Sequence, residues 1–309
     1  MHHPFGQKTE LIKAELFSAM PARYRKKGRN AWTEANRGGI EVECFLEGPC
    51  LDRNGNLWVV DIPFGRIFRI DHSGEWELVV QYDGWPNGMK IHKDGRHFIC
   101  DCRKGLLVLD PRTGQLDVAL ATAHSEGFKG LNDLHFAANG DLYFTDQGQT
   151  GCADPTGRVF RLSADGALER LCSNVPGANG ISLNGSDRQI YVAATGVQQI
   201  WRLPLMPDGS ITKSRVALQF SGGIAGPDGI EMDAEDGLLV CHLGVGVYRF
   251  DNRMLPTHLV YSDDPKHLNL ANIAFGGEDR RTLYIVQALT GEVLMARMPV
   301  PGKKLYAHH

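Results

Sequence analysis

The segment GLNDLHFAANGDLYFTD, residues 130–146, contains the pattern that decides the fold. A polar residue opens a short apolar strand, an Asn-Gly turn follows, and a second strand rich in aromatic and β-branched residues ends on an acid. This arrangement is typical of a tight β-hairpin. Related segments occupy residues 45–61, 84–101, 177–194, 226–242 and 270–287. The chain is therefore a repeat protein built from β-hairpins.

The polar residues that open the six hairpins recur at intervals of 40, 45, 47, 49 and 44 residues. They are Glu47, Asn87, Asn132, Asn179, Asp228 and Asn272. Intervals of this length are typical of a four-stranded propeller blade. A third strand follows every hairpin and a fourth follows the first five, so we predict an all-β, six-bladed β-propeller with four antiparallel strands per blade. Two β-sandwiches would also have short, regularly spaced strands, but they do not explain one polar residue in the same place six times.

The sixth unit has no fourth strand of its own, because the chain ends soon after Met298. We expect the N-terminal strand within residues 10–19 to close this last blade, which would otherwise expose an edge. Residues 1–309 then form a single domain, with the six blades over residues 41–300. The basic stretch at residues 20–40 is expected to be a solvated surface segment.

The composition excludes several classes of protein. Lys and Arg total 33 and Asp and Glu total 36, giving a net charge of -3. The chain therefore lacks the excess of positive charge that is typical of proteins that bind nucleic acid. No apolar run approaches the roughly 20 residues that span a membrane. The N-terminus lacks a signal-peptide pattern, and seven cysteines without a CxxC pair do not indicate a disulfide framework. We expect a soluble cytoplasmic protein that binds neither nucleic acid nor membrane, and its oligomeric state is left undefined.

The six opening residues indicate a site at one mouth of the propeller channel, because the first strand of each blade lies nearest the axis. Glu47 and Asp228 are the acids of this ring, and the other four members are Asn. Crowded buried carboxylates repel one another unless a cation neutralises them. Carboxylate and amide oxygens suit a hard cation such as Ca²⁺, Mg²⁺ or Mn²⁺. The ring therefore predicts a divalent-metal site.

A second ring is expected around the first. Each second strand runs antiparallel to the first, so its end returns to the same mouth of the channel. Asp101, Asp146 and His242 occupy three of these ends. Together with Asn87 and Asn132 of the inner ring, they are the residues that we predict to contact a substrate.

At these positions the sequence resembles the SMP-30/gluconolactonase family of six-bladed propellers. The EGP motif at residues 47–49, the paired Asn-Gly and Asp-Gly openings, and the strands YFTD, GRVFRL and RTLYI are similar to the family pattern over most of the chain. The resemblance implies one divalent metal ion, usually Ca²⁺ and in some members Zn²⁺, Mn²⁺ or Mg²⁺. It implies that Glu47, Asn179 and Asp228 are metal ligands and that Asn132 is a fourth ligand or a substrate contact.

The function that the resemblance implies is metal-dependent hydrolysis of a lactone, a cyclic ester, as in gluconolactonases. The metal would polarise the ester carbonyl, and either Asp228 or a metal-bound water would act as the base. Two alternatives stay open: the same site acting on another ester, a phosphotriester or a fluorophosphate, and a non-catalytic scaffold plugged by calcium. No GxSxG motif indicates a serine nucleophile, and no GxGxxG motif opening a helix indicates a nucleotide cofactor.

Overall fold

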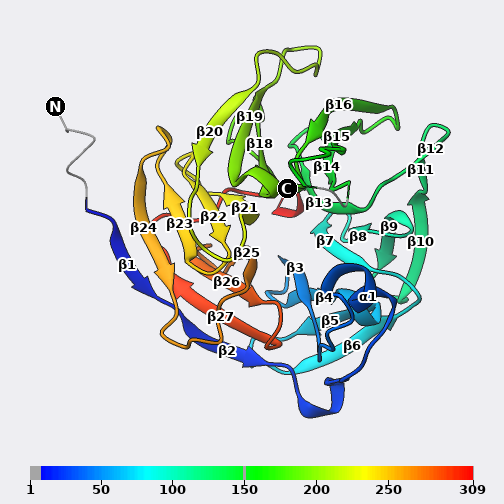
Figure 1. The fold of residues 1–309 in the computed structure, drawn as a ribbon, viewed down its shortest axis with the longest axis vertical. Helices are drawn as coiled ribbons and strands as arrows, with labels where there is room; N and C mark the ends of the chain where they lie inside the picture. The colour runs from blue at the N-terminus through cyan, green and yellow to red at the C-terminus, as the bar shows by residue number, and fades with distance from the viewer. Residues whose placement is uncertain (1–7, 149–150, 309) are drawn as a thin grey trace.

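The computed structural model of the protein is a propeller of six blades around a central channel (Figure 1). It describes residues 8–148 and 151–308; the first seven residues, which bear on the expectation about a signal peptide, lie outside this range. The first three blades consist of β3 (Leu46–Leu51), β4 (Leu57–Asp61), β5 (Arg66–Ile70), β6 (Trp76–Gln81), β7 (Pro86–Ile91), β8 (His97–Asp101), β9 (Gly105–Asp110), β10 (Gln115–Leu120), β13 (Leu131–Phe136), β14 (Leu142–Asp146), β15 (Gly157–Leu162) and β16 (Leu168–Val175).

The second half of the ring has the same organisation. The strands of blades four to six are β17 (Ala178–Leu183), β18 (Gln189–Ala194), β19 (Gln199–Pro204), β20 (Arg215–Gln219), β21 (Pro227–Met232), β22 (Leu238–His242), β23 (Gly246–Phe250), β24 (Pro256–Tyr261), β25 (Leu270–Gly276), β26 (Thr282–Gln287) and β27 (Glu292–Arg297). A small hairpin of β11 (Thr122–Ala123) and β12 (Glu126–Gly127) follows blade two. The predicted six blades of four antiparallel strands are confirmed.

The N-terminal segment closes the ring with two strands rather than one. β2 (Glu15–Ala19) pairs antiparallel with β27 and supplies the missing fourth strand of blade six, as predicted. The preceding strand β1 (Glu10–Lys13) instead pairs in parallel with β24 and becomes a fifth strand of blade five. The short segment therefore covers the outer edges of two neighbouring blades, which would otherwise be open to pairing with other chains.

Hydrophobic side chains hold the blades together because each blade packs both faces against its neighbours. All five residues of β4, of β14 and of β22 are buried. A cluster that includes Leu57, Phe68, Val286 and Val293 joins blade one to blade six, next to the closing strand β2. Such face-to-face packing explains why these second strands are buried along their whole length and not at alternate residues.

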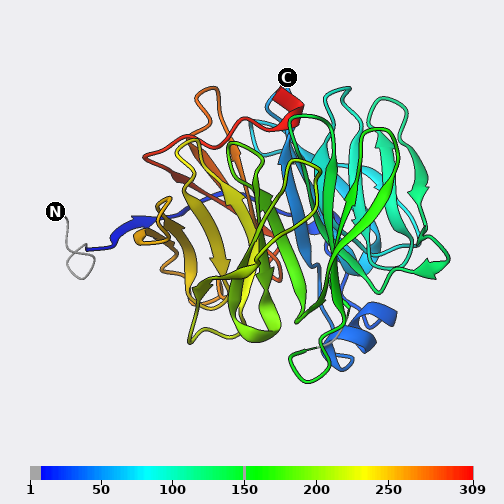
Figure 2. The ribbon, with the colours of Figure 1, turned by 90° about the horizontal axis from the view of Figure 1, so that it is seen from above.

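The two ends of the channel differ. Figure 2 shows α1 (Ala31–Arg37) at one end and the C-terminal turn η4 (Tyr306–His308) at the other. Within residues 20–40, which we expect to be a solvated surface segment, Trp32 of α1 is only 6% exposed and packs its ring against Phe45. Helices are few and short, and none of the described ones is long and apolar enough to cross a bilayer.

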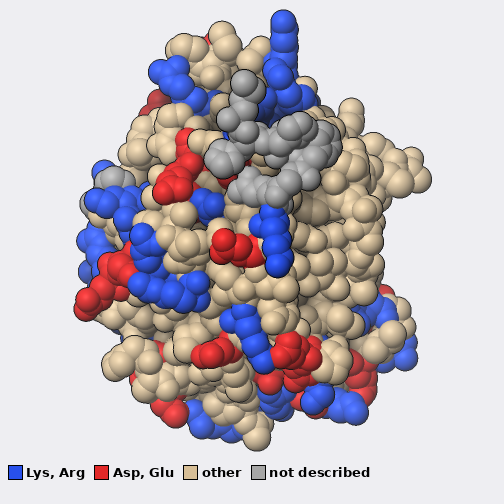
Figure 3. All heavy atoms as spheres, turned by 90° about the vertical axis from the view of Figure 1, so that its left-hand side faces the viewer, with Lys and Arg blue, Asp and Glu red and all other residues tan. Residues whose placement is uncertain are grey.

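The outer surface carries charges of both signs. On the face formed by the outer strands of blades five and six, basic and acidic side chains are interspersed (Figure 3). Several exposed pairs explain this mixture, such as Lys13 with Asp263 and Arg297 with Asp279. Exposed pairs of this kind contribute little to stability, so the ordering of the molecule comes from the packed blades.

Candidate metal and substrate site

Every innermost strand is irregular where its polar residue stands. The pairing between the first and second strands shifts register at Glu47–Cys50, Pro86–Met89, Leu131–Leu134, Ala178–Ile181, Pro227–Ile230 and Leu270–Asn272. A β-bulge bends its strand and redirects its side chains. Five of the six ring residues, all except Asn272, line one pocket at the α1 end of the channel.

Glycines after the ring residues allow the innermost strands to approach one another closely. A Cβ built on Gly180 would lie 2.4 Å from the carbonyl oxygen of Asp228, and one built on Gly229 would lie 2.3 Å from Oδ1 of Asn272. Only glycine fits such a contact with a neighbouring backbone. The glycines of these Asn-Gly and Asp-Gly pairs therefore allow close packing between neighbouring innermost strands and do not form turns.

We expect the substitution Gly180→Ala to lower the free energy of unfolding by about 1–3 kcal/mol, because the new methyl group collides with backbone atoms that cannot move aside. The measurement is urea denaturation of the variant and of the wild type. Gly127→Ala is the matched control, since nothing lies within 4 Å of a Cβ built there. Equal stability losses in the two variants would contradict the close-packing role of Gly180.

The pocket combines a polar floor with an apolar wall and has a volume of about 260 Å³. This volume lies just below the roughly 300–1,000 Å³ of sites for drug-sized ligands, so the pocket suits a smaller molecule. The floor consists of the side chains of Glu47, Asn87, Asn132, Asn179 and Asp228, and the wall includes Trp32, Phe45, Ile62 and Leu243. The arrangement suits a small ligand with a polar reacting group and a carbon framework.

The two carboxylates of the floor are buried, and no Lys, Arg or His of the described residues forms an ion pair with them. Oε2 of Glu47 accepts hydrogen bonds from the backbone N–H of Gly48 and from Nδ2 of Asn272, both at 2.9 Å. Burial and the Asp228 charge raise the pKa of Glu47 well above its usual value. Burial raises the pKa of Asp228 to about 7, against an opposing hydrogen bond from Asn179.

These residues fit a divalent cation bound through oxygen. The described residues contain no cluster of three His, Cys, Asp or Glu side chains placed to hold a metal. The pocket instead brings two carboxylates together with the amides of Asn132 and Asn179. The hydrogen bonds that these two carboxylates accept come from neutral groups, so their charge is left for a ligand to compensate. Carboxylates with amide oxygens are a ligand set that Ca²⁺ accepts.

The structure does not bring the second-ring residues into the pocket. Oδ2 of Asp101 accepts a hydrogen bond from the Tyr82 hydroxyl at 2.7 Å, while its Oδ1 accepts from two backbone N–H groups of the following loop. Asp146 pairs with Arg158, whose Nε lies 2.8 Å from Oδ2. His242 is 2% exposed, and its ring packs at a tilt against that of Phe220. Ends of second strands turn into tight loops, and these side chains bind the loops and neighbouring side chains.

Several pocket residues have no signal in the repeat pattern. Trp32, Asn36 and Arg37 reach the pocket from α1, and Gln147 and Thr195 reach it from loops after second strands. The capping box Asn30-x-x-Thr33, followed by Gly38 in the left-handed conformation, is a local sequence signal that identifies this helix. Residues 149–150 of the loop after Gln147 lie outside the described range.

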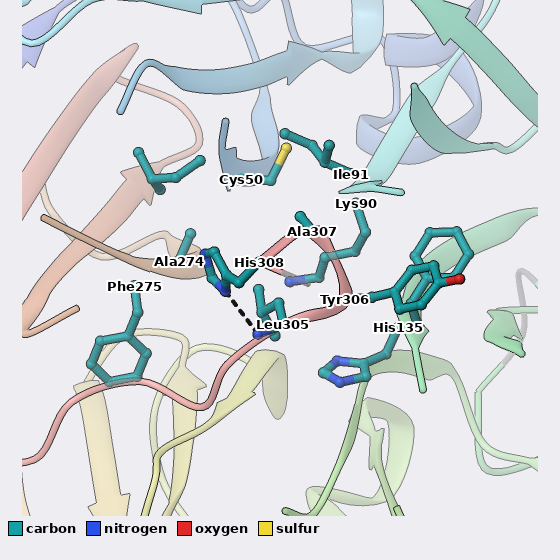
Figure 4. Close-up of a pocket in the computed structure, with 12 residues that line it drawn as sticks. Cys50, Lys90, Ile91, His135, Ala274, Phe275, Leu305, Tyr306, Ala307 and His308 are labelled. Carbon is teal, nitrogen blue, oxygen red and sulfur yellow. Dashed lines mark hydrogen bonds between the residues drawn. The ribbon is translucent and has the colours of Figure 1, made fainter. Parts of the chain in front are cut away.

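The other mouth of the channel is covered by the C-terminal segment. Leu305, Tyr306 and Ala307 line one pocket there together with Lys90 and His135, as the close-up shows (Figure 4). Farther inside, Nζ of Lys90 donates a hydrogen bond to Oε2 of Glu231 at 2.8 Å. The polar pocket on the α1 side is therefore the part of the channel that is organised for a ligand.

Comparisons with known proteins follow the same repeats. The model of the SMP-30/Gluconolactonase/LRE-like region matches residues 45–289. Lactonase drp35 of Staphylococcus aureus is 31% identical over 242 residues, which cover 73% of this chain and 71% of that protein. A gluconolactonase structure from Xanthomonas campestris has a TM-score of 0.73 at 22% identity, covering 92% of this chain and 99% of that chain. A calcium-binding protein, regucalcin, from Agrobacterium tumefaciens has a TM-score of 0.77 at 19% identity, with coverages of 98% and 100%.

The fold and pocket define the class, a six-bladed propeller whose channel holds buried acids and amides at one mouth. This chain belongs to the SMP-30/gluconolactonase/LRE-like family, because the family match extends from the first blade into the last. The two structural likenesses, at 22% and 19% identity, support the shared propeller fold.

Proposed function

We propose that this protein hydrolyses lactones and that Glu47, Asn132, Asn179 and Asp228 hold a divalent cation, with Ca²⁺ as the first candidate. The observation that carries the proposal is the pair of buried carboxylates, from blades one and five, which share one pocket with amides and have neutral partners. The names of the relatives support the reaction and the ion: a lactonase, a gluconolactonase and a calcium-binding regucalcin.

The residues of the pocket have distinct roles in this proposal. A bound cation supplies Lewis-acid polarisation of the ester carbonyl. The carboxylate of Asp228 would accept the proton of the attacking water. Burial raises the pKa of Asp228 to about 7 in the metal-free pocket, and a bound cation would lower it by stabilising the charged form. The side-chain amides of Asn87 and Asn132 lie on the pocket floor and donate hydrogen bonds to substrate oxygens. Trp32 and Ile62 shield the reacting carbonyl from bulk water.

The two acids of the second ring act on the site indirectly. Asp101 accepts hydrogen bonds from the loop after β8, whereas Asp146 binds Arg158 on β15 and the backbone N–H of Lys129 before β13. The residues that follow the two acids, Cys102 and Gln147, line the pocket. We therefore assign substrate contact to Asn87 and Asn132 and a supporting role to the two acids.

Metal removal tests the proposal. The chelator-treated protein should lose hydrolysis of a panel of sugar, alkyl and aryl lactones, and return of Ca²⁺, Mn²⁺, Zn²⁺ or Mg²⁺ should restore it and raise the melting temperature. Bound ligand stabilises the folded state by about 2.7 kcal/mol at a hundredfold excess over Kd. Full turnover after chelation would overturn the role of the metal. A melting temperature raised by metal without turnover of any lactone would favour the scaffold or another ester.

A further inference from the structure

Helix α1 is fixed over the mouth of the pocket by contacts at both ends. Oδ1 of Asn30 accepts hydrogen bonds from the backbone N–H groups of Trp32 and Thr33, and its Nδ2 donates to the carbonyl oxygen of Pro63 at 3.1 Å. Gly38 ends the helix in the left-handed conformation. The buried Trp32 packs against Phe45, with ring centroids 4.9 Å apart. A side chain of the last helical turn is therefore presented to the pocket from a fixed position.

Arg37 is that side chain. Arg37 is half-buried and lines the pocket, and its Nε is buried with no hydrogen-bond partner among residues 8–148 and 151–308. Other arginines around this end of the propeller have acidic partners: Arg103 Nη1 lies 2.8 Å from Asp83, and Arg158 Nε lies 2.8 Å from Asp146. A desolvated N–H without an acceptor costs free energy, and an acceptor on a ligand in the pocket would remove this cost.

The charge of the pocket indicates what kind of acceptor fits. Among the described residues that line it, the formally charged ones are Glu47, Asp228 and Arg37. A divalent cation held by Glu47, Asn132, Asn179 and Asp228 would compensate the two carboxylates, which would leave the charge of Arg37 uncompensated. Arginine presents a planar fork of N–H donors that matches a carboxylate in two parallel hydrogen bonds.

We propose that Arg37 binds a carboxylate on the substrate, so that the preferred lactones carry an acid group on the ring. The ester carbonyl lies on the polar floor with the metal, the ring carbons pack against Trp32 and Ile62, and the carboxylate projects towards the end of α1. The proposal rests on the lactonase function proposed above, and it narrows the substrate class to anionic lactones.

A matched pair of γ-lactones tests this assignment: γ-valerolactone, which is neutral, and 5-oxotetrahydrofuran-2-carboxylate, which replaces the methyl group by a carboxylate. We expect Arg37→Gln to lower the ratio of kcat/KM for the acid to kcat/KM for the neutral lactone by about 10- to 100-fold, the range for a lost charge-assisted hydrogen bond. Arg37→Lys should give an intermediate ratio. Arg29→Gln is the control, because Arg29 is exposed and pairs with Glu34 on the same segment. An unchanged ratio in Arg37→Gln would overturn the proposal.

A binding measurement separates this inference from the lactonase proposal. The lactams 5-oxopyrrolidine-2-carboxylate and 5-methylpyrrolidin-2-one have the same two shapes, and we use them as ring analogues that resist opening. Calorimetry with the Ca²⁺-loaded protein should show tighter binding of the acid, and Arg37→Gln should remove the difference. If no lactone is hydrolysed but this pattern is seen, the anion site stands and the lactonase proposal fails. Equal binding of both lactams by the wild type would overturn the anion site.

Discussion

Replacing Asp228 by Asn is expected to lower kcat/KM for lactone hydrolysis by about 10²–10⁴-fold, because the proposed general base is lost. The same change removes one of the two acidic ligands of the proposed cation, so calorimetry should also show weaker metal binding. Asp117→Asn is the matched control, since Asp117 is exposed on the outer strand β10. Turnover of Asp228→Asn at the wild-type rate, with or without metal, would contradict both roles of this carboxylate.

In the metal-free protein, Asp228→Asn should raise the free energy of unfolding, although it lowers the activity. Burial, assisted by the Asp133 charge and opposed by the Asn179 hydrogen bond, raises the pKa of Asp228 to about 7, whereas an unfolded Asp has a pKa near 3.9. The folded state then binds the proton more tightly, so the free energy of unfolding falls as the pH rises through this interval. Asp228→Asn removes this pH-dependent loss of stability. In the presence of chelator, we expect the free energy of unfolding of the variant to exceed that of the wild type by more at pH 8 than at pH 5, with a difference on the order of 2 kcal/mol.

Urea denaturation at the two pH values checks this expectation. A pH-independent difference between Asp228→Asn and the wild type would show that the carboxylate does not titrate as a buried group. Gain of stability together with loss of activity would indicate that the acid is present for ligand binding and not for folding.

The second prediction with a large expected effect concerns the buried ion pair between Lys90 and Glu231, which we expect to stabilise the folded protein. Lys90→Met should lower the free energy of unfolding by about 3–5 kcal/mol, because it leaves the Glu231 carboxylate buried without its cation. The two side chains are 8% and 2% exposed. Burial lowers the pKa of Lys90, but Glu231 and Asp133 raise it above its usual value, and Lys90 in turn lowers the pKa of Glu231 against the effect of burial. Both groups are therefore charged at neutral pH.

A double-mutant cycle provides the control for this prediction. The variant Lys90→Met/Glu231→Leu removes both charges and should recover most of the loss, since a buried pair replaced by apolar side chains is often neutral for stability. Arg112→Met breaks an exposed pair with Asp110 and should cost less than about 1 kcal/mol. Additive effects of the two channel substitutions, measured by urea denaturation, would show that the residues do not act as a pair.

The propeller could be predicted because the sequence patterns that specify its hairpins are local and occur six times. Each hairpin carries its own turn residues and strand pattern, and six copies at near-constant intervals leave few architectures open. Closure by the N-terminal segment also followed from a local fact, the missing fourth strand of the last unit. The division of that segment into β1 and β2, on two different blades, did not follow from it.

The candidate site was predictable only in part. Glu47, Asn132 and Asp228 open innermost strands, so the topology alone directs them to one mouth, and the structure places them in one pocket. Asp101 and Asp146 end second strands at the same mouth, but their side chains bind Tyr82 and Arg158. The position of a residue along a strand could be predicted from the sequence. The direction of its side chain depended on the hydrogen-bond or ion-pair partner that the tertiary structure brings next to it.

The sequence by itself determined the number of blades, the closing of the ring and the mouth where acids and amides gather, because strand pattern and chain order specify these features. Only the tertiary structure decided that α1 brings Trp32 and Arg37 over the pocket, that the C-terminal segment covers the opposite mouth, and that Lys90 meets Glu231 across the channel. The physical reason is sequence separation. These contacts join residues that lie in different blades or outside the repeats, and they form only when all six blades pack around a common axis.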